Sequence, residues 1–266
     1  MMRPQSNVSV KAIRQTTDIA GTRMVRTGYE PALKLSEHSH RHANITVVLA
    51  GELTEWSEGR AYRRGAGSVV IKPAGTTHAN LVGPDGAVTL AVELRRGRNQ
   101  VWRDRPRKYG WTQGPDIIGM IISLWKAAAQ HDLADSIPDI TRLLAQAYEA
   151  TSVHPDSPRA IPDWLSMVHT IIEKNYDDAL QVQSLAEQVG VHRVHLSRTF
   201  RRVHGIGIVE YIHRRRVMRI ATLLARAELP LADVALTLGY ADQAHMTRVF
   251  TARIGMSPAA YRRLLL

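Results

Sequence analysis

The sequence contains no cysteine, and this absence excludes several kinds of chemistry. A chain without thiols forms no disulfide, holds no thiolate zinc site and has no cysteine nucleophile. The absence is compatible with a reducing compartment, and we expect the protein in the cytoplasm.

Long apolar runs are also missing. The longest, residues 117–125, is interrupted by Gly119 and Ser123 and followed by Lys126. It is far shorter than the roughly 20 residues that a helix needs to cross a bilayer. The first 13 residues are polar and lack the apolar core of a secretory signal. We therefore expect neither an export signal nor a membrane partner.

Acidic residues are scarce relative to basic ones. The chain has 24 Asp and Glu against 35 Lys and Arg, a formal net charge of +11. Its 266 residues are 44% hydrophobic, which excludes wholesale disorder and suggests one large domain or two ordinary ones. The positive charge favours nucleic acid as a partner, and a net +6 of it lies in residues 159–266.

The first 110 residues have the pattern of a small β-barrel or sandwich. Short runs rich in β-branched residues alternate with glycine-containing segments that we predict to be turns. The predicted strands are 45–49, 68–71 and 88–92, and the predicted turns are 50–51, 65–67 and 83–86.

The middle of the chain changes character twice. Residues 95–108 hold seven basic side chains against one acidic side chain, which indicates a solvated connector. Residues 111–150 contain two predicted helices, 116–125 and 138–150, each with an apolar face. These two accessory helices either pair with a second copy of the chain or form a lid on the barrel; we adopt the dimer. Residues 151–162 hold three prolines and are predicted to be a linker.

The last hundred residues repeat themselves. Residues 185–190 match 234–239, and the two copies continue with the matched residues Leu196, Arg198 and Phe200, and Met246, Arg248 and Phe250. Each copy has the parts of a helix-turn-helix: a glycine for a sharp turn, a small Ala for close packing, and a second helix with one buried stripe. Two ordinary helical hairpins are the alternative, but the repeat on a basic domain favours DNA binding.

Helical geometry selects the side chains that face away from the buried stripes. We predict that they contact DNA: Val194, His195, Ser197 and Arg198 on the first helix, and Gln243, Ala244, Thr247 and Arg248 on the second. Arginine suits guanine, glutamine suits adenine, and valine suits the thymine methyl group. Phosphate contact, which positions the protein without specifying a sequence, is the alternative for Arg198, Thr247 and Arg248.

Residues 180–263 resemble the DNA-binding domain of the AraC/XylS family of bacterial transcription regulators. The resemblance rests on Ser184-Leu185-Ala186 with Gly190, His195-Leu196-Ser197-Arg198 with Phe200, Gly205, Ala235 to Tyr240, Thr247 to Phe250, Gly255, and Ser257 to Arg262. It implies that residues 163–266 place two recognition helices in successive major grooves of promoter DNA. By the same analogy the protein activates transcription by contacting RNA polymerase.

The amino-terminal region resembles the two cupin motifs, and regulators of this family commonly carry such a barrel as an effector-binding domain. The motif residues are His38-x-His40, Asn44 and Gly51, then Gly67 and Pro73-x-Gly75-x-x-His78. Metal-binding cupins use a glutamate where this chain has Asn44. Three neutral imidazoles remain able to hold zinc, iron or nickel, and a third possibility is that the histidines are structural.

We favour a pocket for an organic effector, with no metal and no cofactor. Its predicted lining is His38, His40, Asn44, Thr46 and His78. His42 also lies at an even-numbered position, so strand alternation does not distinguish it from these residues. The sequence thus predicts a cupin-like sensor barrel (1–110), a helical dimerisation element (111–150), a linker (151–162) and an all-α domain with two helix-turn-helix motifs (163–266). The expected function is a non-enzymatic, ligand-responsive, homodimeric regulator. The alternatives are a metal-dependent cupin enzyme with a DNA-binding tail and a nonspecific nucleic-acid binder.

Overall fold

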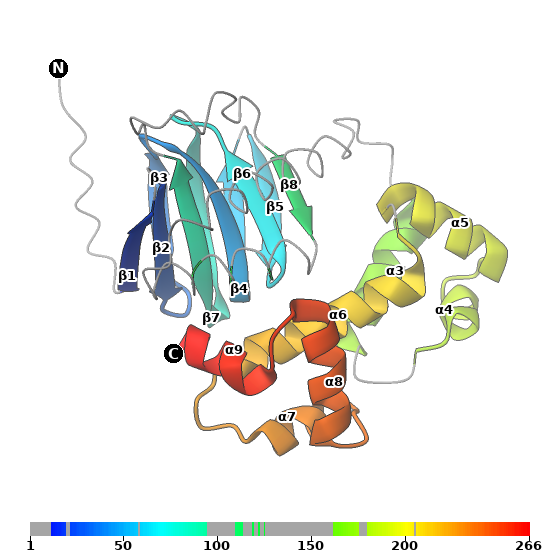
Figure 1. Ribbon diagram of the computed structural model, residues 1–266. Coiled ribbons are helices and arrows are strands. Elements are labelled where there is room, and N and C mark those ends of the chain that lie inside the picture. Colours follow the sequence, from blue (N-terminus) through cyan, green and yellow to red (C-terminus); the bar gives the residue numbers. More distant parts are fainter. Residues whose placement is uncertain are drawn as a thin grey trace. The chain divides into compact units, whose positions relative to one another are not determined.

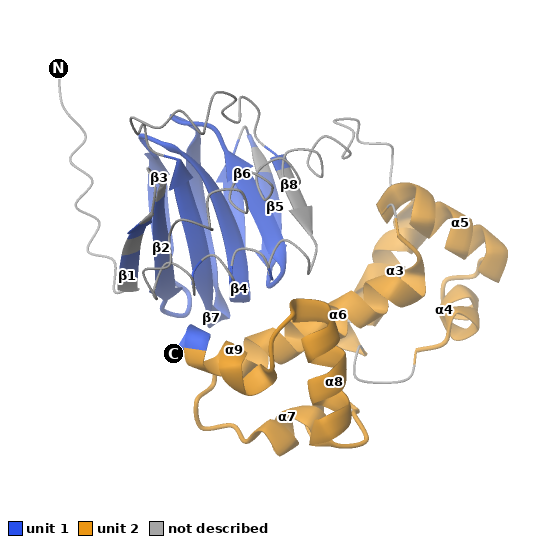
Figure 2. Ribbon diagram, in the orientation of Figure 1, with its two compact units in different colours: residues 1–154, 264–266 blue, residues 155–263 orange. Residues whose placement is uncertain are grey.

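The computed structural model describes residues 12–19, 22–57, 59–94, 110–113, 119, 122, 125, 162–175, 180–204 and 206–266. The chain divides into two compact units near residue 154, and the last three residues are grouped with the first unit (Figure 2). The described strands belong to the first unit, and helices α3 to α8 belong to the second (Figure 1). A strand-rich amino-terminal part and a helical carboxy-terminal part are therefore confirmed.

Several predicted segments lie outside the described residues. These are the basic connector 95–108, the second accessory helix 138–150 and, except for Pro162, the linker 151–162. Of the first accessory helix, only Gly119, Ile122 and Trp125 are described, and all three are helical.

The first unit contains one antiparallel sheet with the strand order β1-β2-β7-β4-β6-β8, to which β3 adds on β7 and β5 adds on β4. The strands are β1 (Ala12–Ile19), β2 (Thr22–Tyr29), β3 (Lys34–Ser39), β4 (Ala43–Ser57), β5 (Arg60–Gly65), β6 (Ser68–Lys72), β7 (Thr77–Leu94) and β8 (Gly110–Gln113).

The long strands β4 and β7 organise this sheet, because each pairs with different neighbours along its length. The first half of β4 pairs with β6 and its second half with β5. The first half of β7 pairs with β3 and its second half with β2. The predicted turns at 50–51 and 83–86 are therefore wrong, since both segments lie inside these strands. Only 65–67 forms the predicted turn, between β5 and β6.

Glycines mark irregularities in the two long strands rather than chain reversals. The pairing of β4 with β7 shifts register between Gly51 and Leu53, where these residues face Ala87 and Val82. Four residues of β7, 83–86, thus bulge opposite Glu52. Gly51 has φ +71°, and a Cβ added there would lie 2.0 Å from the carbonyl oxygen of Gly86. Only glycine fits at this point, because the backbones of β4 and β7 lie too close together for a side chain.

One face of the sheet is apolar. Alternate side chains of β4, β6 and β7 are almost fully buried: Ile45, Val47, Leu49, Val69, Ile71, Leu90 and Val92. Because successive side chains of a strand point to opposite faces, the residues between them turn to the other side of the sheet. There the polar residues Asn44 and Thr46 lie.

The second unit contains α3 (Asp163–Lys174), α4 (Val182–Gln188), α5 (Arg193–His204), α6 (Ile208–Leu224), α7 (Leu231–Thr237), α8 (Gln243–Ile254) and all but the end of α9 (Pro258–Leu265). The pairs α4–α5 and α7–α8 correspond to the two sequence repeats. Helix α6 connects the two pairs.

Both helix pairs use the same turn. In each, a glycine with φ +69° follows the first helix, Gly190 after α4 and Gly239 after α7. The next residue donates its backbone N–H to the carbonyl of the small alanine: Val191 to Ala186 and Tyr240 to Ala235, each at 3.0 Å. This is the Schellman arrangement, which satisfies carbonyls at the end of a helix. The predicted left-handed glycine and buried alanine are confirmed in both copies.

No helix among the described residues is long and apolar enough to cross a membrane.

Candidate functional site

The second helices of the two pairs expose matched faces. On α5 the side chains of Val194, His195 and Arg198 are exposed and Ser197 is half-buried. On α8, Gln243, Ala244 and Arg248 are exposed, and Thr247, which corresponds to Ser197, is half-buried. All eight residues predicted to contact DNA thus lie on one of these two helices, with none of them in the core.

The opposite stripe of α5 fixes the helix in its domain. Leu196 and Phe200 are fully buried in a core that also takes in Leu165 and Val168 from α3 and Ile212 from α6. His204, near the end of α5, shares a 2.8 Å hydrogen bond between Nε2 atoms with His169 of α3. Helix α3, on which the sequence placed no functional residue, therefore holds the exposed face of α5 in position.

Helix α8 is held by its ends and by an ion pair. The Asp242 side chain accepts a 2.6 Å hydrogen bond from the backbone N–H of His245 and caps the first turn. Gly255, with φ +80°, ends the helix. Arg253 forms hydrogen bonds with both carboxylate oxygens of Glu210 on α6, at 2.5 and 2.9 Å. These bonds hold the pKa of Glu210 at about 2, and Arg214 acts in the same direction.

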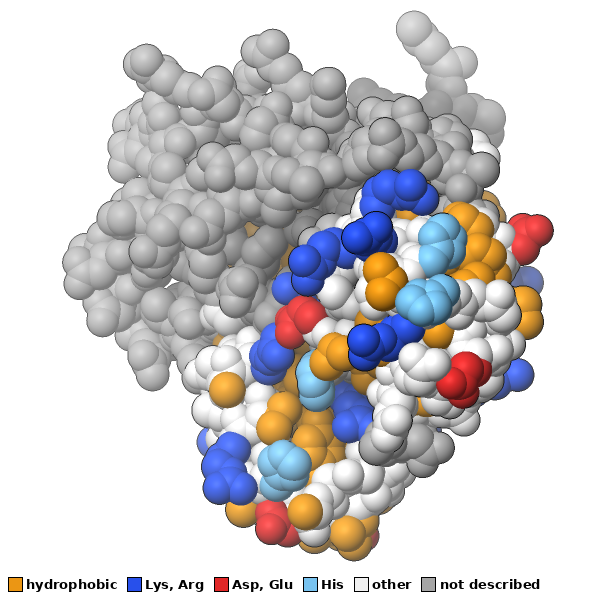
Figure 3. Space-filling model, turned by 90° about the vertical axis from the view of Figure 1, so that its right-hand side faces the viewer, with side chains coloured by type: hydrophobic (Ala, Val, Ile, Leu, Met, Phe, Trp, Pro, Cys, Tyr) orange, Lys and Arg blue, Asp and Glu red, His pale blue; other side chains and the backbone are white. Residues whose placement is uncertain are grey.

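Basic side chains gather on one face of the helical unit. Figure 3 shows a band of Lys, Arg and His side chains on this face, with fewer Asp and Glu side chains among them. Exposed Arg193, Arg198, Arg201 and Arg202 all belong to α5. A surface of this kind attracts the phosphate groups of nucleic acid. Helix α6 adds four further arginines, all of them only partly exposed: Arg214, Arg215, Arg216 and Arg219.

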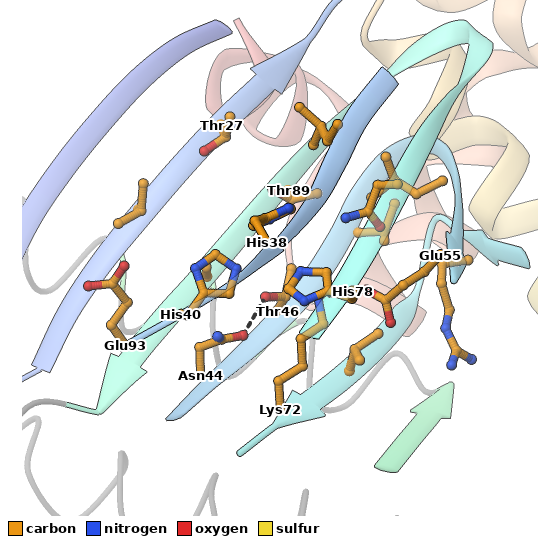
Figure 4. A pocket seen from close by; sticks show the side chains of 18 of the residues that line it. Thr27, His38, His40, Asn44, Thr46, Glu55, Lys72, His78, Thr89 and Glu93 are labelled. Atoms are coloured by element: carbon orange, nitrogen blue, oxygen red, sulfur yellow. Dashed lines mark hydrogen bonds and ion pairs between the residues drawn. The ribbon is translucent and has the colours of Figure 1, made fainter. Parts of the chain in front are cut away.

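The first unit has a cavity of about 530 Å³, lined by both polar and apolar side chains, on the face of the sheet opposite its apolar side (Figure 4). The five residues predicted to line an effector pocket, His38, His40, Asn44, Thr46 and His78, all line it. His42, which strand alternation did not distinguish from them, is not among the lining residues.

The cavity also has charged and polar lining residues that the sequence analysis did not predict: Glu55, Lys72, Asn80, Glu93 and the almost completely buried Arg64. Because strand side chains alternate, Asn44 and Thr46 predict that even-numbered residues of β4 line the cavity. Beyond the bulge at Gly51 the odd-numbered residues Leu53 and Glu55 line it instead. The same change occurs in β7, where even-numbered His78 and Asn80 line the cavity before the bulge and odd-numbered Thr89, Ala91 and Glu93 line it after the bulge. Two features of the sequence could have indicated these residues. One is the pair of glycine segments 50–51 and 83–86, which we predicted to be turns, and the other is Lys72 at the end of the apolar strand β6.

His38, His40 and His78 form a cluster in this cavity (Figure 4). His38 and His78 are direct partners in the register of β3 and β7, and His40 follows β3. The ring centroids are 4.4 Å apart for His38 and His78, 5.1 Å for His40 and His78, and 5.2 Å for His38 and His40. One ring nitrogen from each residue lies within 4.8 Å of those of the others.

A buried ion pair borders the cluster. Lys72 Nζ lies 2.6 Å from Glu55 Oε2, and both side chains are more than nine-tenths buried. Burial lowers the pKa of Lys72, against the attraction of Glu55. Burial also lowers the pKa of His78 to about 4, and Lys72 adds to this shift. His78 is therefore neutral near pH 7 and keeps a lone pair for a hydrogen-bond donor or a metal ion.

The comparisons with known proteins concern mainly the helical unit. A family model described as a helix-turn-helix domain matches residues 185–264. Regulatory protein SoxS of Salmonella typhimurium is 33% identical over 102 residues, which are 37% of this chain and 95% of SoxS. The bifunctional transcriptional activator/DNA repair enzyme AdaA of Bacillus subtilis is 30% identical over 110 residues, 41% of this chain and 50% of AdaA. The chain thus spans half the length of AdaA.

Two further comparisons extend over both units. The arabinose operon regulatory protein of Escherichia coli is 23% identical over 243 residues, 82% of this chain and 79% of that protein. The crystal structure of ToxT from Vibrio cholerae matches 92% of this chain and 98% of ToxT, with 11% identity and a TM-score of 0.41. The helix-turn-helix match and the near-complete coverage of SoxS show the relationship: the chain belongs to the AraC/XylS family of DNA-binding transcription regulators.

Proposed function

We propose that this protein is a sequence-specific transcription regulator whose two helix pairs are both helix-turn-helix motifs that read DNA. The observation that carries the proposal is the equivalence of the pairs. They share the glycine turn, the alanine contact and the buried stripe, and they expose corresponding residues on α5 and α8. Two recognition helices in one unit fit two successive major grooves on one side of a duplex.

Arg198 and Arg248 are the side chains that we expect to reach base edges. They occupy the same position in the two copies, and both are exposed. A bidentate arginine–guanine contact contributes about 1–3 kcal/mol of discrimination between bases. Arg201, also exposed but close to the end of α5, is expected to contact phosphate.

Selection of bound sequences from a random duplex library tests this assignment. The wild type is expected to select a bipartite site. Arg198→Ala should relax preference in one half of the site and Arg248→Ala in the other. The matched control Arg201→Ala removes the same charge and should weaken all sequences alike, with a smaller salt dependence. If all three variants lose affinity uniformly, the protein binds by charge alone and the assignment is wrong.

We further propose that the cavity of the first unit binds a small effector that controls the DNA-binding unit. The support is a cavity of about 530 Å³ in the size range of small-molecule sites, with all five predicted residues in its lining. An effector that binds the DNA-competent arrangement more tightly shifts the population toward it. The proposal assigns no catalytic reaction to the chain.

Thermodynamic coupling is the measurement that tests effector control. Candidate small molecules are titrated into the protein with and without the selected operator. A true effector changes operator affinity, and the operator changes effector affinity by the same factor. The proposal fails if molecules that bind this cavity leave operator affinity unchanged.

We also propose a homodimer, formed through residues 111–150, that contacts RNA polymerase. Sedimentation equilibrium of the full chain tests the dimer.

A further inference from the structure

We propose that the ligand of the cavity in the first unit is an uncharged molecule that carries several hydroxyl groups. This inference rests on the effector site proposed above and names the chemistry of its ligand. It is carried by the balance of charge around the cavity, by buried hydrogen-bond acceptors in its lining and by the apolar side chains beside them.

The first argument is that protein groups balance the charges of the lining. Lys72 is paired with Glu55, and both side chains are more than nine-tenths buried. Arg23 donates from Nε and Nη2 to the two carboxylate oxygens of Asp18, at 2.9 and 3.1 Å. Glu93 also attracts Arg23. Each of these cations therefore already has a carboxylate of the protein as its counterion.

Arg64 is the remaining cation of the lining. Its side chain is almost completely buried, and its guanidinium carbon lies 4.5 Å from the centroid of the Tyr62 ring. Counted with Asp18, the partner of Arg23, the lining carries three basic and three acidic side chains. A charged ligand would add a net charge that this set does not compensate, and burial of such a charge is costly.

The second argument is that buried acceptors face the ligand. His78 Nδ1 lies 3.2 Å from the carbonyl oxygen of Thr76, and because a carbonyl oxygen only accepts, Nδ1 carries the proton. The neutral ring therefore keeps a lone pair on Nε2, and Figure 4 shows this ring in the cavity. Asn80 Oδ1 is buried and has no hydrogen-bond partner among the described residues. A ligand that donates hydrogen bonds would satisfy both acceptors.

The spacing of these acceptors calls for more than one donor. His78 and Asn80 lie two residues apart on β7, so they project to the same side of the strand about 7 Å apart. Asn44 offers the opposite polarity, because its amide oxygen already accepts a 3.1 Å hydrogen bond from Thr46 and leaves the amide N–H groups as donors. A carboxylate cannot donate to His78 or Asn80, whereas hydroxyl groups both donate and accept.

The third argument is the apolar part of the lining. Aliphatic side chains stand beside the polar ones: Val25, Leu35, Val48, Leu53 and Val70. They would contact the carbon–hydrogen surface of a ligand whose hydroxyl groups point to His78, Asn80 and Asn44. Small-molecule sites commonly combine an apolar lining with a few polar groups that fix orientation.

The experiment compares matched probes that differ in charge. The neutral probes are D-glucose, D-xylose and catechol. Their anionic counterparts are D-gluconate, D-xylonate and protocatechuate, and their cationic counterparts are D-glucosamine, D-xylosamine and dopamine. Each is titrated into the full chain without DNA at pH 7, in a calorimeter. We expect at least one neutral probe to bind below millimolar concentration and more tightly than both of its charged counterparts.

Variants of Asn80 place the bound probe in this cavity. Asn80→Ala should weaken binding of the neutral probe about 10-fold, as the loss of one hydrogen bond does. Asn80→Asp keeps an acceptor but adds a negative charge, so it should shift preference toward the cationic counterpart. The control His42→Ala, outside the lining, should bind as the wild type does. Circular dichroism reports whether each variant folds, and the comparison of probes needs only the wild type.

The inference is overturned if a charged counterpart binds more tightly than its neutral parent, or if no neutral probe binds below millimolar concentration. It is equally overturned if folded Asn80→Ala and Asn80→Asp bind the probes as the wild type does. Because the operator does not enter these titrations, such failures leave effector control intact. A neutral probe that binds here without changing operator affinity would instead contradict effector control and leave the ligand chemistry supported.

Discussion

Glu210 on α6 and Arg253 on α8 are 43 residues apart in the sequence and are joined by two side-chain hydrogen bonds of 2.5 and 2.9 Å. Arg214, one turn further along α6, binds the same carboxylate at 2.9 Å. Glu210 thus links the connecting helix α6 to α8, and the link depends on its negative charge.

The charge of Glu210 makes the helical unit sensitive to acid. The carboxylate has a pKa of about 2 in the folded protein, against an ordinary value of 4.5. A group whose pKa is lower when folded stabilises the protein above its unfolded pKa, and this contribution is lost as the pH falls from about 4.5 toward 2. Both partners are one-third exposed, so solvent screening reduces the effect.

Glu210→Gln is therefore expected to lower the free energy of unfolding by about 1 kcal/mol at pH 7 and by much less near pH 2. Urea unfolding at a series of pH values measures the difference. Glu228→Gln removes an exposed carboxylate outside this pair and serves as the control. A loss that stays constant from pH 7 to pH 2 contradicts the assignment.

Gly190 and Gly51, which both have a positive φ, should tolerate substitution unequally. A Cβ at Gly190 meets no atom within 4 Å, so Gly190→Ala should cost only the left-handed conformation, about 1–2 kcal/mol. A Cβ at Gly51 lies 2.0 Å from a backbone oxygen of Gly86, so Gly51→Ala forces β4 and β7 apart. Thermal unfolding and expression of soluble protein compare the two variants. Similar losses in both contradict this explanation.

The cap of α8 provides a test that does not involve DNA. Asp242→Ala removes the acceptor for the His245 N–H and is expected to cost about 1 kcal/mol. Asp242→Asn keeps an acceptor and should recover most of that loss. Chemical denaturation of the three proteins decides, and equal stability of the Ala and Asn variants contradicts a capping role.

The buried pair Lys72–Glu55 should show strong coupling between its members. Removing one partner leaves a buried charge without its counterion, and such changes cost about 3–5 kcal/mol. The double variant Lys72→Met, Glu55→Gln should lose less than the sum of the two single variants. A double-mutant cycle in urea measures the coupling, and additive losses rule it out.

Sequence reasoning located the helical unit well because its signals are local. The left-handed glycines and the buried alanines Ala186 and Ala235 appear in the sequence as a repeat. The helical period then places Leu196 on the buried face of its helix and Arg198 on the exposed face. The five cavity residues were accessible for a similar reason, since they lie in short motifs. The ligand roles assigned to both sets stay predictions.

The rest of the cavity depends on register between distant strands. Glu55 and Glu93 lie beyond the bulges of β4 and β7, where the alternation is reversed, and no local pattern separates a bulge from a turn. Glu210 was missed for a related reason: its partner Arg253 lies on another helix. Such pairings follow from tertiary structure rather than from the order of residues.

Helix α6 contributes Ile208 and Ile212 to the core beneath α5 and binds α8 through Glu210. Its 17 residues span about 25 Å at 1.5 Å per residue. Under the proposed binding of DNA by both α5 and α8, the length of α6 would set the distance between the two half-sites and its twist the angle between them. One residue inserted into α6 would rotate α8 by about 100° relative to α5, and the two helices would then no longer fit successive grooves.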